Sequence, residues 1–482
     1  MGSGFGSLSA AIRLASLGFN VTVFEKNAYP GGKCCEIKID NYRFDKGPSL
    51  FTMPQLVDEL LAFSPQKIEF EYEKLSTITH YFYEDGLMVT GFANADALAE
   101  ELHVKLGEEK EQVKAHLKEA SFFYKVTAPV FLTQSIHKFK YLFNLNTLKG
   151  ILSSYRLRLF STMHEVNTKR FKNEKTVQLF NRFATYNGSS PYMAPALLNI
   201  IPHLESSMGA YLPKKGMSDI SHVLVACAKA LGVKFLFNQT VNKILLENNS
   251  AIGLVSNGEV FKSDLTLANA DMHAVYKTLL PEKYTPYKLL NQPKSSSAYI
   301  FYWGIRSKFP QLHLHNILFS QNYQKEFDCL FNSEEPFEDP TIYINITSKL
   351  IKSDAPSDGE NWFVMVNVPH NHSHGQINYA TKLRKLVIEK INRMLKISIE
   401  ELIEAEEILD PFSIETQTSS WGGSLYGNAS NSKWAAFLRH ANFSSTIKNL
   451  YFSGGSVHPG GGIPLALLSG KIVSNIIKDD HC

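Results

Sequence analysis

A chain of 482 residues, 44% of them hydrophobic and 20% charged, is long enough for two or three domains and has the composition of a folded globular protein. Its formal net charge of only +3 excludes the overall basic character of a nucleic-acid-binding protein. The five cysteines contain no CxxC pair, so we expect neither a disulfide framework nor a metal site, and a reducing compartment such as the cytoplasm is favoured. There is no secretion signal and no run of about 18 apolar residues, so we expect neither export nor a membrane-spanning helix.

The first element that we expect is a phosphate-binding turn followed by a helix. Gly2, Gly4 and Gly6 form the turn, Ser7 stands at the third glycine place, and small and apolar residues then recur at helical spacing until Gly18. Glycines at the first two places let the backbone turn tightly and approach a pyrophosphate, whose negative charge is favoured by the helix N-terminus. The segment therefore predicts a dinucleotide site.

An acidic residue at the end of the next element supports this interpretation. Residues 19–25 read as a short strand that ends in Glu25. A carboxylate about 20 residues after the glycines holds the hydroxyl pair of a ribose and repels a 2′-phosphate, which argues against NADP. The alternative is a glycine-rich turn before an ordinary helix, with a solvated Glu25.

One part of the expected pattern is missing from the sequence. The phosphate turn of a dinucleotide fold follows a hydrophobic strand, but here only Met1 precedes Gly2. That strand lies in the middle of the sheet, so its loss would leave neighbouring strands without hydrogen-bond partners. We therefore expect residues upstream of Met1 to belong to the natural protein.

Three further motifs give the chain a family resemblance. They are Pro30-Gly31-Gly32-Lys33, Phe44-Asp45-Lys46-Gly47-Pro48-Ser49 and the glycine-rich run 449–464, which includes His458 and Pro459. Together with the first turn they resemble the bacterial carotenoid desaturase family, also called phytoene-type, of FAD flavoproteins, over essentially the whole chain. The resemblance implies an α/β fold: a Rossmann-like FAD-binding domain of the amine-oxidase type, an interleaved α+β substrate domain and a helical membrane-facing part.

The resemblance also implies FAD as the sole organic cofactor and indicates which residues hold it. The positions that carry over are Gly2, Gly4, Gly6, Ser7, Glu25, Lys26, Gly32, Lys33, Val241, Gly455, Gly462, Ile463 and Pro464. Those up to Lys33 belong to the phosphate and ribose motifs, the backbone of Val241 would contact adenine, and the last four would lie beside the flavin. Lys33 stands where arginine is common, so we expect a point-charge attraction there rather than bidentate phosphate contact.

The same resemblance divides the chain into two interleaved parts. Residues 1–75, 210–285 and 415–482 would form the FAD-binding domain, and residues 76–209 and 286–414 the substrate domain. A helical pattern before residue 228 and two alternating strand patterns at 233–237 and 241–244 agree with a return to the FAD-binding domain in mid-chain.

A basic and apolar segment, residues 127–172, is the candidate for membrane contact. Its cations are Lys138, Lys140, Lys149, Arg156, Arg158, Lys169, Arg170 and Lys172, against the single acid Glu165. Apolar residues between them, Phe131 and Leu132 first, could insert shallowly while the cations meet anionic headgroups, at about 1 kcal/mol per basic residue. The alternative is a solvated basic helix with its apolar face in the core. Given a carotenoid substrate, we expect a cytoplasmic protein peripherally associated with the membrane.

Three segments resemble, within the family, the 1-hydroxycarotenoid 3,4-desaturases most closely. They are residues 186–191, 201–205 and 432–439. Their polar residues His203, Glu205 and Arg439 are candidates for binding a terminal hydroxyl, because a site built to hydrogen-bond an OH rejects analogues that lack it. For each of them the alternative is a packed or surface polar residue.

The implied reaction is desaturation of a carotenoid with hydride transfer to the flavin. It removes the equivalent of a hydride and a proton, and the polyene delocalises the positive charge left behind. His458 lies in the glycine-rich run 449–464, which we call the flavin-side loop. It is a weak candidate to relay the proton, because the favoured role for it is to hold this loop by hydrogen bonds. Oxygen or a membrane quinone would accept the electrons. A phytoene desaturase, a carotenoid isomerase of the same fold and a carotenoid-binding protein with a decayed flavin site remain as alternatives.

Overall fold

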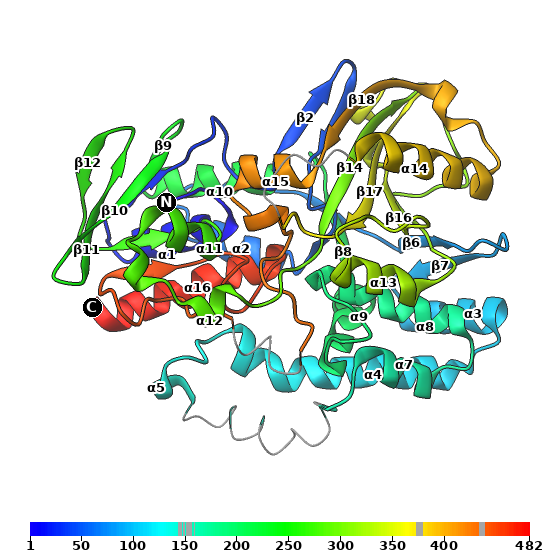
Figure 1. Cartoon of the computed structure of the whole chain (residues 1–482), viewed down its shortest axis with the longest axis horizontal. Helices are drawn as coiled ribbons and strands as arrows, with labels where there is room; N and C mark the ends of the chain where they lie inside the picture. Colours follow the sequence, from blue (N-terminus) through cyan, green and yellow to red (C-terminus); the bar gives the residue numbers. More distant parts are fainter. Residues whose placement is uncertain (143–146, 148–149, 151–156, 159, 373–378, 433–438) are drawn as a thin grey trace.

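The computed structural model describes the whole chain except residues 143–146, 148–149, 151–156, 159, 373–378 and 433–438. Two regions lie side by side (Figure 1). The first contains both termini and is built from helices and short strands. The second is built around a large sheet with helices packed on it and below it.

Two pairs of parallel strands lie at the centre of the first region. They are β1 (Thr22–Phe24) with β9 (Lys234–Leu236), and β13 (Thr266–Ala268) with β19 (Leu450–Phe452). Each pair joins segments that are far apart in the sequence, as parallel strands require a long connection. The α/β arrangement expected of a nucleotide-binding part is confirmed.

The backbone of Met1 and Gly2 lies between the two strand pairs. The Met1 amine donates to the Leu267 carbonyl at 2.7 Å, and the Met1 carbonyl accepts from the N–H of Asn269 at 2.9 Å. The Gly2 N–H donates to the Phe24 carbonyl at 2.7 Å. These two residues thus bond to both pairs at the place where we expected a strand, and the expectation of upstream residues stays a prediction.

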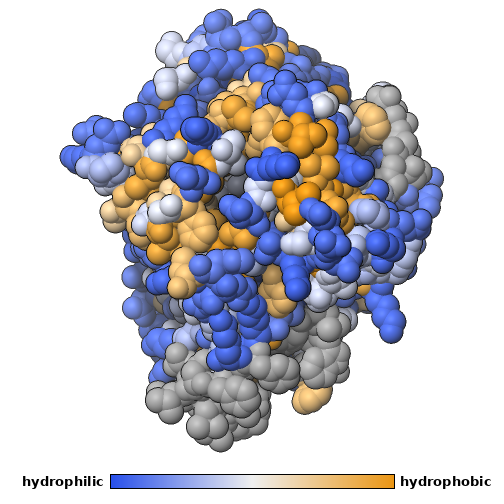
Figure 2. All heavy atoms as spheres, turned by 90° about the vertical axis from the view of Figure 1, so that its left-hand side faces the viewer, coloured by the Kyte–Doolittle hydropathy of each residue, from blue (hydrophilic) through white to orange (hydrophobic). Residues whose placement is uncertain are grey.

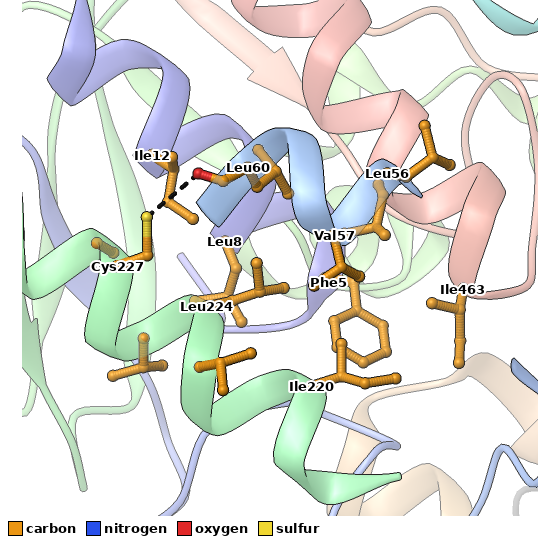
Figure 3. Close-up of a cluster of buried hydrophobic side chains, with 14 of the residues drawn as sticks. Phe5, Leu8, Ile12, Leu56, Val57, Leu60, Ile220, Leu224, Cys227 and Ile463 are labelled. Atoms are coloured by element: carbon orange, nitrogen blue, oxygen red, sulfur yellow. Dashed lines mark hydrogen bonds between the residues drawn. The ribbon is translucent and has the colours of Figure 1, made fainter. Parts of the chain in front are cut away.

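Four helices pack together to form the core of the first region (Figure 3). They are α1 (Phe5–Ser16), α2 (Gln55–Leu61), α10 (Ser218–Ala230) and α16 (Ile463–His481). Leu8 and Ile12 of α1 are fully buried against Leu60 of α2 and Leu224 of α10. Each such side chain contributes about 1.5–3 kcal/mol by leaving water. The N-terminal segment is thereby fixed to the middle and the end of the chain.

Helices α1 and α16 approach each other unusually closely. The Ser9 hydroxyl of α1 donates to the Leu467 carbonyl of α16 at 2.7 Å. A Cβ atom at Gly470 would lie 2.5 Å from the Gly6 carbonyl oxygen and 2.6 Å from Cβ of Ser9. Only glycine fits at position 470 without moving the two helices apart.

The second region is organised by a seven-stranded sheet. Its strand order is β18-β14-β17-β16-β15-β6-β7, and only β15 and β6 pair in parallel. The strands are β6 (Thr77–Phe82), β7 (Met88–Phe92), β14 (Ser297–Ile305), β15 (His315–Leu318), β16 (Ile342–Asn345), β17 (Glu360–Val368) and β18 (Ile403–Leu409). Helix α14 (Ala380–Leu395) packs on one face of the sheet. Trp303 and Trp362 of the sheet are fully buried in the same hydrophobic cluster as this helix. The opposite face is free to line a cavity.

Helices pack beneath the end of this sheet that carries β6 and β7. They are α3 (Ala95–Leu106), α4 (Lys110–Thr127), α7 (Met163–Arg170), α8 (Glu174–Asn181) and α13 (Tyr323–Asn332). The Asn94 side chain caps α3 by accepting from two backbone N–H groups, and Gly107 ends the helix in the left-handed conformation. Smaller sheets complete the fold: β10 (Val241–Glu247), β11 (Ser250–Ser256) and β12 (Glu259–Lys262); β2 (Glu36–Ile39) and β3 (Tyr42–Asp45); and β4 (Phe51–Thr52), β8 (Ala210–Pro213) and β5 (Tyr72–Lys74).

The structure describes only part of the basic segment 127–172, since Lys149 and Arg156 lie outside the described residues. In the described part several of its cations pair with acids from outside the segment. The pairs are Lys138 with Asp480, Lys140 with Asp479, Arg158 and Arg170 with Glu119, and Lys172 with Glu109. The segment is therefore less cationic in the fold than in the sequence, where Glu165 is its single acid.

In the described residues no helix has both the length and the apolar character needed to cross a bilayer. Apolar side chains nevertheless reach the surface, Val260 of β12 with 60% of its area exposed among them. At the end of the molecule that carries β10, β11 and β12, apolar patches alternate with polar side chains (Figure 2). The division into an FAD-binding and a substrate domain at residues 75, 210, 285 and 415 stays a prediction.

We predict that Gly470→Ala destabilises the protein although alanine is the better helix former. The added Cβ would overpack the contact between α1 and α16, which we expect to lower the free energy of unfolding by about 1–3 kcal/mol. Because both glycine loops precede these helices, the flavin content should fall as well. Thermal unfolding and flavin absorbance of the purified protein measure the two effects. Asn475→Ala, at an exposed position of α16, is the control and should change neither quantity; an unchanged melting temperature for Gly470→Ala would contradict the prediction.

Candidate functional site

A cavity of about 600 Å³ runs between the two regions. One end is lined by glycines of the first turn, by Lys33 and by the glycine loop before α16. The other end is lined by apolar side chains and by the free face of the seven-stranded sheet. The cavity thus joins the predicted cofactor motifs to the predicted substrate part in one continuous space.

The first turn places the N-terminus of α1 against the cavity. Gly4 is the N-cap residue, has an extended backbone and makes no side-chain capping bond. A Cβ at Gly4 would lie 2.6 Å from the Asn269 amide nitrogen, and a Cβ at Gly6 would lie 2.6 Å from the backbone nitrogen of Gly454. The turn is therefore a cradle of bare backbone that a side chain would fill, and it fits a pyrophosphate such as that of FAD.

Glu25 lies at the end of β1, as the sequence predicted, and is 5% exposed. Its carboxylate accepts from the Ser3 N–H and the Ser3 hydroxyl, both at 2.7 Å, and from the Asn27 N–H at 2.9 Å. A carboxylate with about four acceptor positions keeps room for a further donor such as a ribose hydroxyl. Sequence reasoning missed Ser3, whose only signal was its place between two glycines of the turn.

Two other predicted residues, Lys26 and Val241, lie outside the cavity lining. The Lys26 ammonium donates to the Thr416 carbonyl at 2.8 Å and to the Ser419 hydroxyl at 3.0 Å. Val241 begins β10 and is half-buried. Lys26 and Val241 do not line the cavity, so their contact with the cofactor stays a prediction.

Lys33 is enclosed beside Gly32 and both line the cavity. Its ammonium donates to the backbone carbonyls of Leu425 at 2.6 Å and Ser424 at 3.3 Å. Burial lowers the pKa of Lys33 to about 8, against the opposing effect of the Asp271 carboxylate. A cation held among carbonyls and glycines, with bare helix N-termini nearby, fits the charge of a bound phosphate.

The glycine loop before α16 forms the opposite side of the same end. Gly455, Gly462, Ile463 and Pro464 all line the cavity, and Gly462 caps α16 with a φ of 97°. Two helix N-termini, those of α1 and α16, thus face one space. Asn269, which follows β13, lies against Gly2, Gly4, Gly6 and Gly454. It links the two loops, at the end of a strand that the family resemblance placed near the cofactor.

The three polar candidates for binding the substrate do not come together. Glu205 lines the cavity, is 4% exposed and pairs with the buried Arg182 at 3.1 Å. His203 is buried outside the cavity wall, with its ring 5.4 Å from that of Tyr124. Arg439 lies under the flavin-side loop, and residues 433–438 of the third segment lie outside the described residues.

Among the described residues, the Arg439 guanidinium bonds to neutral carbonyl and amide oxygens and not to a carboxylate. Its guanidinium donates to the Asn187 side chain at 3.0 Å, to the Asn428 carbonyl at 3.1 Å and to the Gly455 carbonyl at 3.4 Å. Burial lowers its pKa to about 10. These contacts fasten the flavin-side loop to residue 187 of the substrate part, so the geometry gives Arg439 a positioning role.

His458 is fully buried and does not line the cavity. Its Nε2 lies 3.0 Å from the Gln134 carbonyl, and its own carbonyl accepts from the Asn442 amide at 2.9 Å. Burial lowers its pKa to about 3. These bonds hold the loop, which is the role that the sequence favoured over proton relay. Phe131, predicted to insert into a membrane, instead packs on the His458 ring at 4.8 Å and lines the cavity together with Leu132.

The chain is similar to known proteins over essentially its whole length. Residues 8–478 match the family model "Flavin containing amine oxidoreductase". The chain is 48% identical over 482 residues to a 1-hydroxycarotenoid 3,4-desaturase of Flavobacterium sp., covering 100% of this chain and 99% of that one. It is 29% identical to a phytoene desaturase of Phycomyces blakesleeanus, covering 99% and 84% of the two chains. A solved structure of a redesigned putrescine oxidase superposes with a TM-score of 0.64 at 13% identity, covering 99% and 98% of the chains, which supports the fold alone.

We predict that FAD affinity falls as the pH rises above about 8. A bound pyrophosphate favours charged Lys33 and raises its pKa above the value of about 8 that burial gives it. Below that pH the ammonium is already present; above it, binding must take up a proton, so Kd rises by up to about tenfold per pH unit. Flavin fluorescence titrations of the apoprotein from pH 6.5 to 9.5 measure this slope.

The matched variants for this prediction are Lys33→Met and Lys74→Met. Lys33→Met should bind FAD more weakly below pH 8 and lose the slope, because it removes the titrating group while keeping the length of the side chain. Lys74 is exposed on β5, and Lys74→Met should keep the wild-type profile. A wild-type Kd that does not change across this range would contradict the role given to Lys33.

Proposed function

Because the chain belongs to the flavin containing amine oxidoreductase family, we propose that it is an FAD-dependent carotenoid desaturase that introduces the 3,4 double bond of a 1-hydroxycarotenoid. Identity of 48% over the full length to a desaturase of that name carries the proposal. The prediction of FAD as the cofactor is confirmed by the family match, and the two glycine loops supply a cradle that fits it.

The substrate end of the cavity suits a hydrocarbon. Its walls are formed largely by aliphatic and aromatic side chains from separate elements: Phe131, Leu132, Leu197, Leu198, Ile200, Ile201, Leu204, Ile300, Ile317, Phe327, Phe363 and Met365. Such walls orient a long polyene by shape and exclude water from it. Few polar groups are needed where the substrate carries almost none.

Bound FAD would supply the hydride acceptor for a desaturation that removes a hydride and a proton from neighbouring carbons. The chain contributes position and a dry environment. Arg439 ties the flavin-side loop to Asn187, and Tyr426 packs on the Gly461 backbone of that loop, where a Cβ would lie 2.8 Å from its ring. The carbon chain is thereby confined between the loop and the sheet.

We predict that the FAD-loaded enzyme desaturates a 1-hydroxy-γ-carotene-type substrate in preference to phytoene. Each product should be two hydrogens lighter and absorb at longer wavelength, since the polyene is extended, and under anaerobic conditions the flavin band should bleach. Chromatography with mass spectrometry and absorption spectra measures both.

The remaining candidates are separated by the same assay. Conversion of phytoene alone would overturn the hydroxycarotenoid assignment and favour a phytoene desaturase. A red shift without loss of two hydrogens would indicate an isomerase. A preparation that binds carotenoid but never shows a bleachable flavin would indicate a binding protein with a decayed cofactor site.

We further propose that the enzyme works at the cytoplasmic surface of a membrane, from which it takes its substrate, and that oxygen or a membrane quinone finally accepts the electrons. The basic segment 127–172 supports membrane contact by composition. Two accessible cations of the segment are Lys169, which is exposed and forms no ion pair with another described residue, and Lys172, which is 74% exposed.

We predict that the protein sediments with vesicles rich in phosphatidylserine and less with pure phosphatidylcholine, and that salt weakens the association. Lys169→Glu with Lys172→Glu should weaken it by about tenfold or more, at about 1 kcal/mol for each lost cation. Lys229→Glu with Lys243→Glu changes the same net charge at exposed positions outside the segment and should have a smaller effect. Equal loss in the two pairs would show that only overall charge matters.

A further inference from the structure

One wall of the cavity carries polar side chains that a hydrocarbon substrate does not require. Side chains alternate between the faces of a strand, and His315 and Ile317 of β15 stand opposite Asn345 and Tyr343 of β16. His315, Ile317 and Tyr343 line the cavity, as does Thr79 of β6. This part of the sheet therefore presents a histidine, a phenol and a hydroxyl to the substrate space.

His315 lines this space and carries a buried ring nitrogen without a hydrogen-bond partner among the described residues. Its Nδ1 lies 2.7 Å from the Tyr343 hydroxyl and 3.1 Å from the Asn345 amide nitrogen, which can only donate. The amide orientation follows from a second bond to the Leu314 carbonyl at 3.0 Å, so Nδ1 accepts from both groups. With Nδ1 as an acceptor, the proton of the neutral ring lies on Nε2. The imidazole is neutral because burial, and then the charges of His313 and Arg182, lower its pKa to about 3. Nε2 is buried and bonds to no group among the described residues.

Glu205 presents a spare acceptor to the same cavity. Its carboxylate accepts from the Arg182 guanidinium at 3.1 and 3.4 Å and from the Tyr186 hydroxyl. These bonds crowd Oε1, whereas Oε2 accepts from Arg182 alone among the described residues, and each carboxylate oxygen can accept two bonds. Arg182 is fixed in turn by the Tyr81 hydroxyl at 2.9 Å. The acceptor is thus rigidly held.

A hydroxyl is the group that needs one donor and one acceptor together. We propose that His315 and Glu205 form the receptor for the hydroxyl of the substrate, with His315 Nε2 donating to its oxygen and the Glu205 carboxylate accepting its proton, and that they set the preference for hydroxylated carotenoids. The inference rests on the proposed function. An analogue without the hydroxyl leaves a buried donor and a buried acceptor unpaired, so it is rejected.

The position of this receptor agrees with the bond that is to be formed. The oxygen of a hydroxyl on C1 is only three bonds from C3, so its receptor must lie close to the flavin-side loop. Tyr186, in the Glu205 cluster, is followed by Asn187, which accepts from Arg439, and by Gly188, where a Cβ would lie 2.8 Å from the Tyr426 ring. Arg439 and Tyr426 both contact the flavin-side loop. The receptor is therefore linked to that loop through one short segment.

The test compares kcat/KM for a 1-hydroxycarotenoid and for the same carotenoid lacking the hydroxyl. In His315→Asn the amide oxygen can replace Nδ1 while the Nε2 donor is lost. We expect its kcat/KM for the hydroxylated substrate to fall about tenfold to a hundredfold and that for the other substrate to stay within about threefold. His315→Gln, which can place a donor near the position of Nε2, should recover part of the preference. Glu205→Gln should lower the preference too.

Controls separate this role from packing. His313→Asn changes a histidine of the same segment that does not line the cavity, and should leave the preference unchanged. Flavin content and melting temperature report folding; if Glu205→Gln does not fold because Arg182 is left unpaired, the two His315 variants decide the outcome. Equal losses on both substrates in His315→Asn would overturn the receptor while the desaturase function stands. A wild-type enzyme that converts neither substrate would overturn both.

Discussion

The contact between α1 and α16 is the constraint on which the cofactor site depends. Both helices begin at a glycine loop, and their N-termini can face one phosphate-binding space only if their axes lie very close together. Gly470 allows this approach, and the bond from Ser9 to the Leu467 carbonyl fixes it. Asn269 then fills the gap between the two loops. The glycines at 4, 6 and 454 follow from this geometry, because a side chain at any of them would strike Asn269 or the opposite loop.

The substrate end obeys a different constraint. An apolar tunnel would be simplest if every wall were hydrocarbon, yet Arg182 and Glu205 are 5% and 4% exposed in its wall. A buried ion pair often contributes no net stability, because taking two charges out of water offsets their attraction. Its presence in a cavity built for a nearly apolar molecule is better explained by recognition. Ser49, Tyr343 and His315 form a second hydrogen-bonded group in the cavity wall, in which the Tyr343 hydroxyl lies 2.7 Å from each of the other two side chains.

The sequence predicted those features whose signals are local. The turn at 2–7, the acid at 25 and the glycine loop before α16 each lie within a short stretch, and the family match confirms the flavoprotein fold and cofactor that they implied. Ser3 and His315 were missed because their roles arise from contacts between separate segments: Ser3 bonds to Glu25, and β15 pairs with β16. Phe131 and Leu132 were assigned to a membrane face on composition, which does not distinguish an outward apolar side chain from one turned to a cavity. His203 and Glu205 are two residues apart and both buried, yet only Glu205 lines the cavity.

The strand pairs β1 with β9 and β13 with β19 affect how much assembled protein a cell contains. The cofactor site closes only after segments from the beginning, middle and end of the chain have met, and such long-range contacts form slowly. A ligand that binds only the assembled state stabilises it by mass action. The level of intact enzyme should therefore follow the supply of flavin, so that a shortage of riboflavin lowers pigment synthesis through loss of the protein as well as loss of its activity.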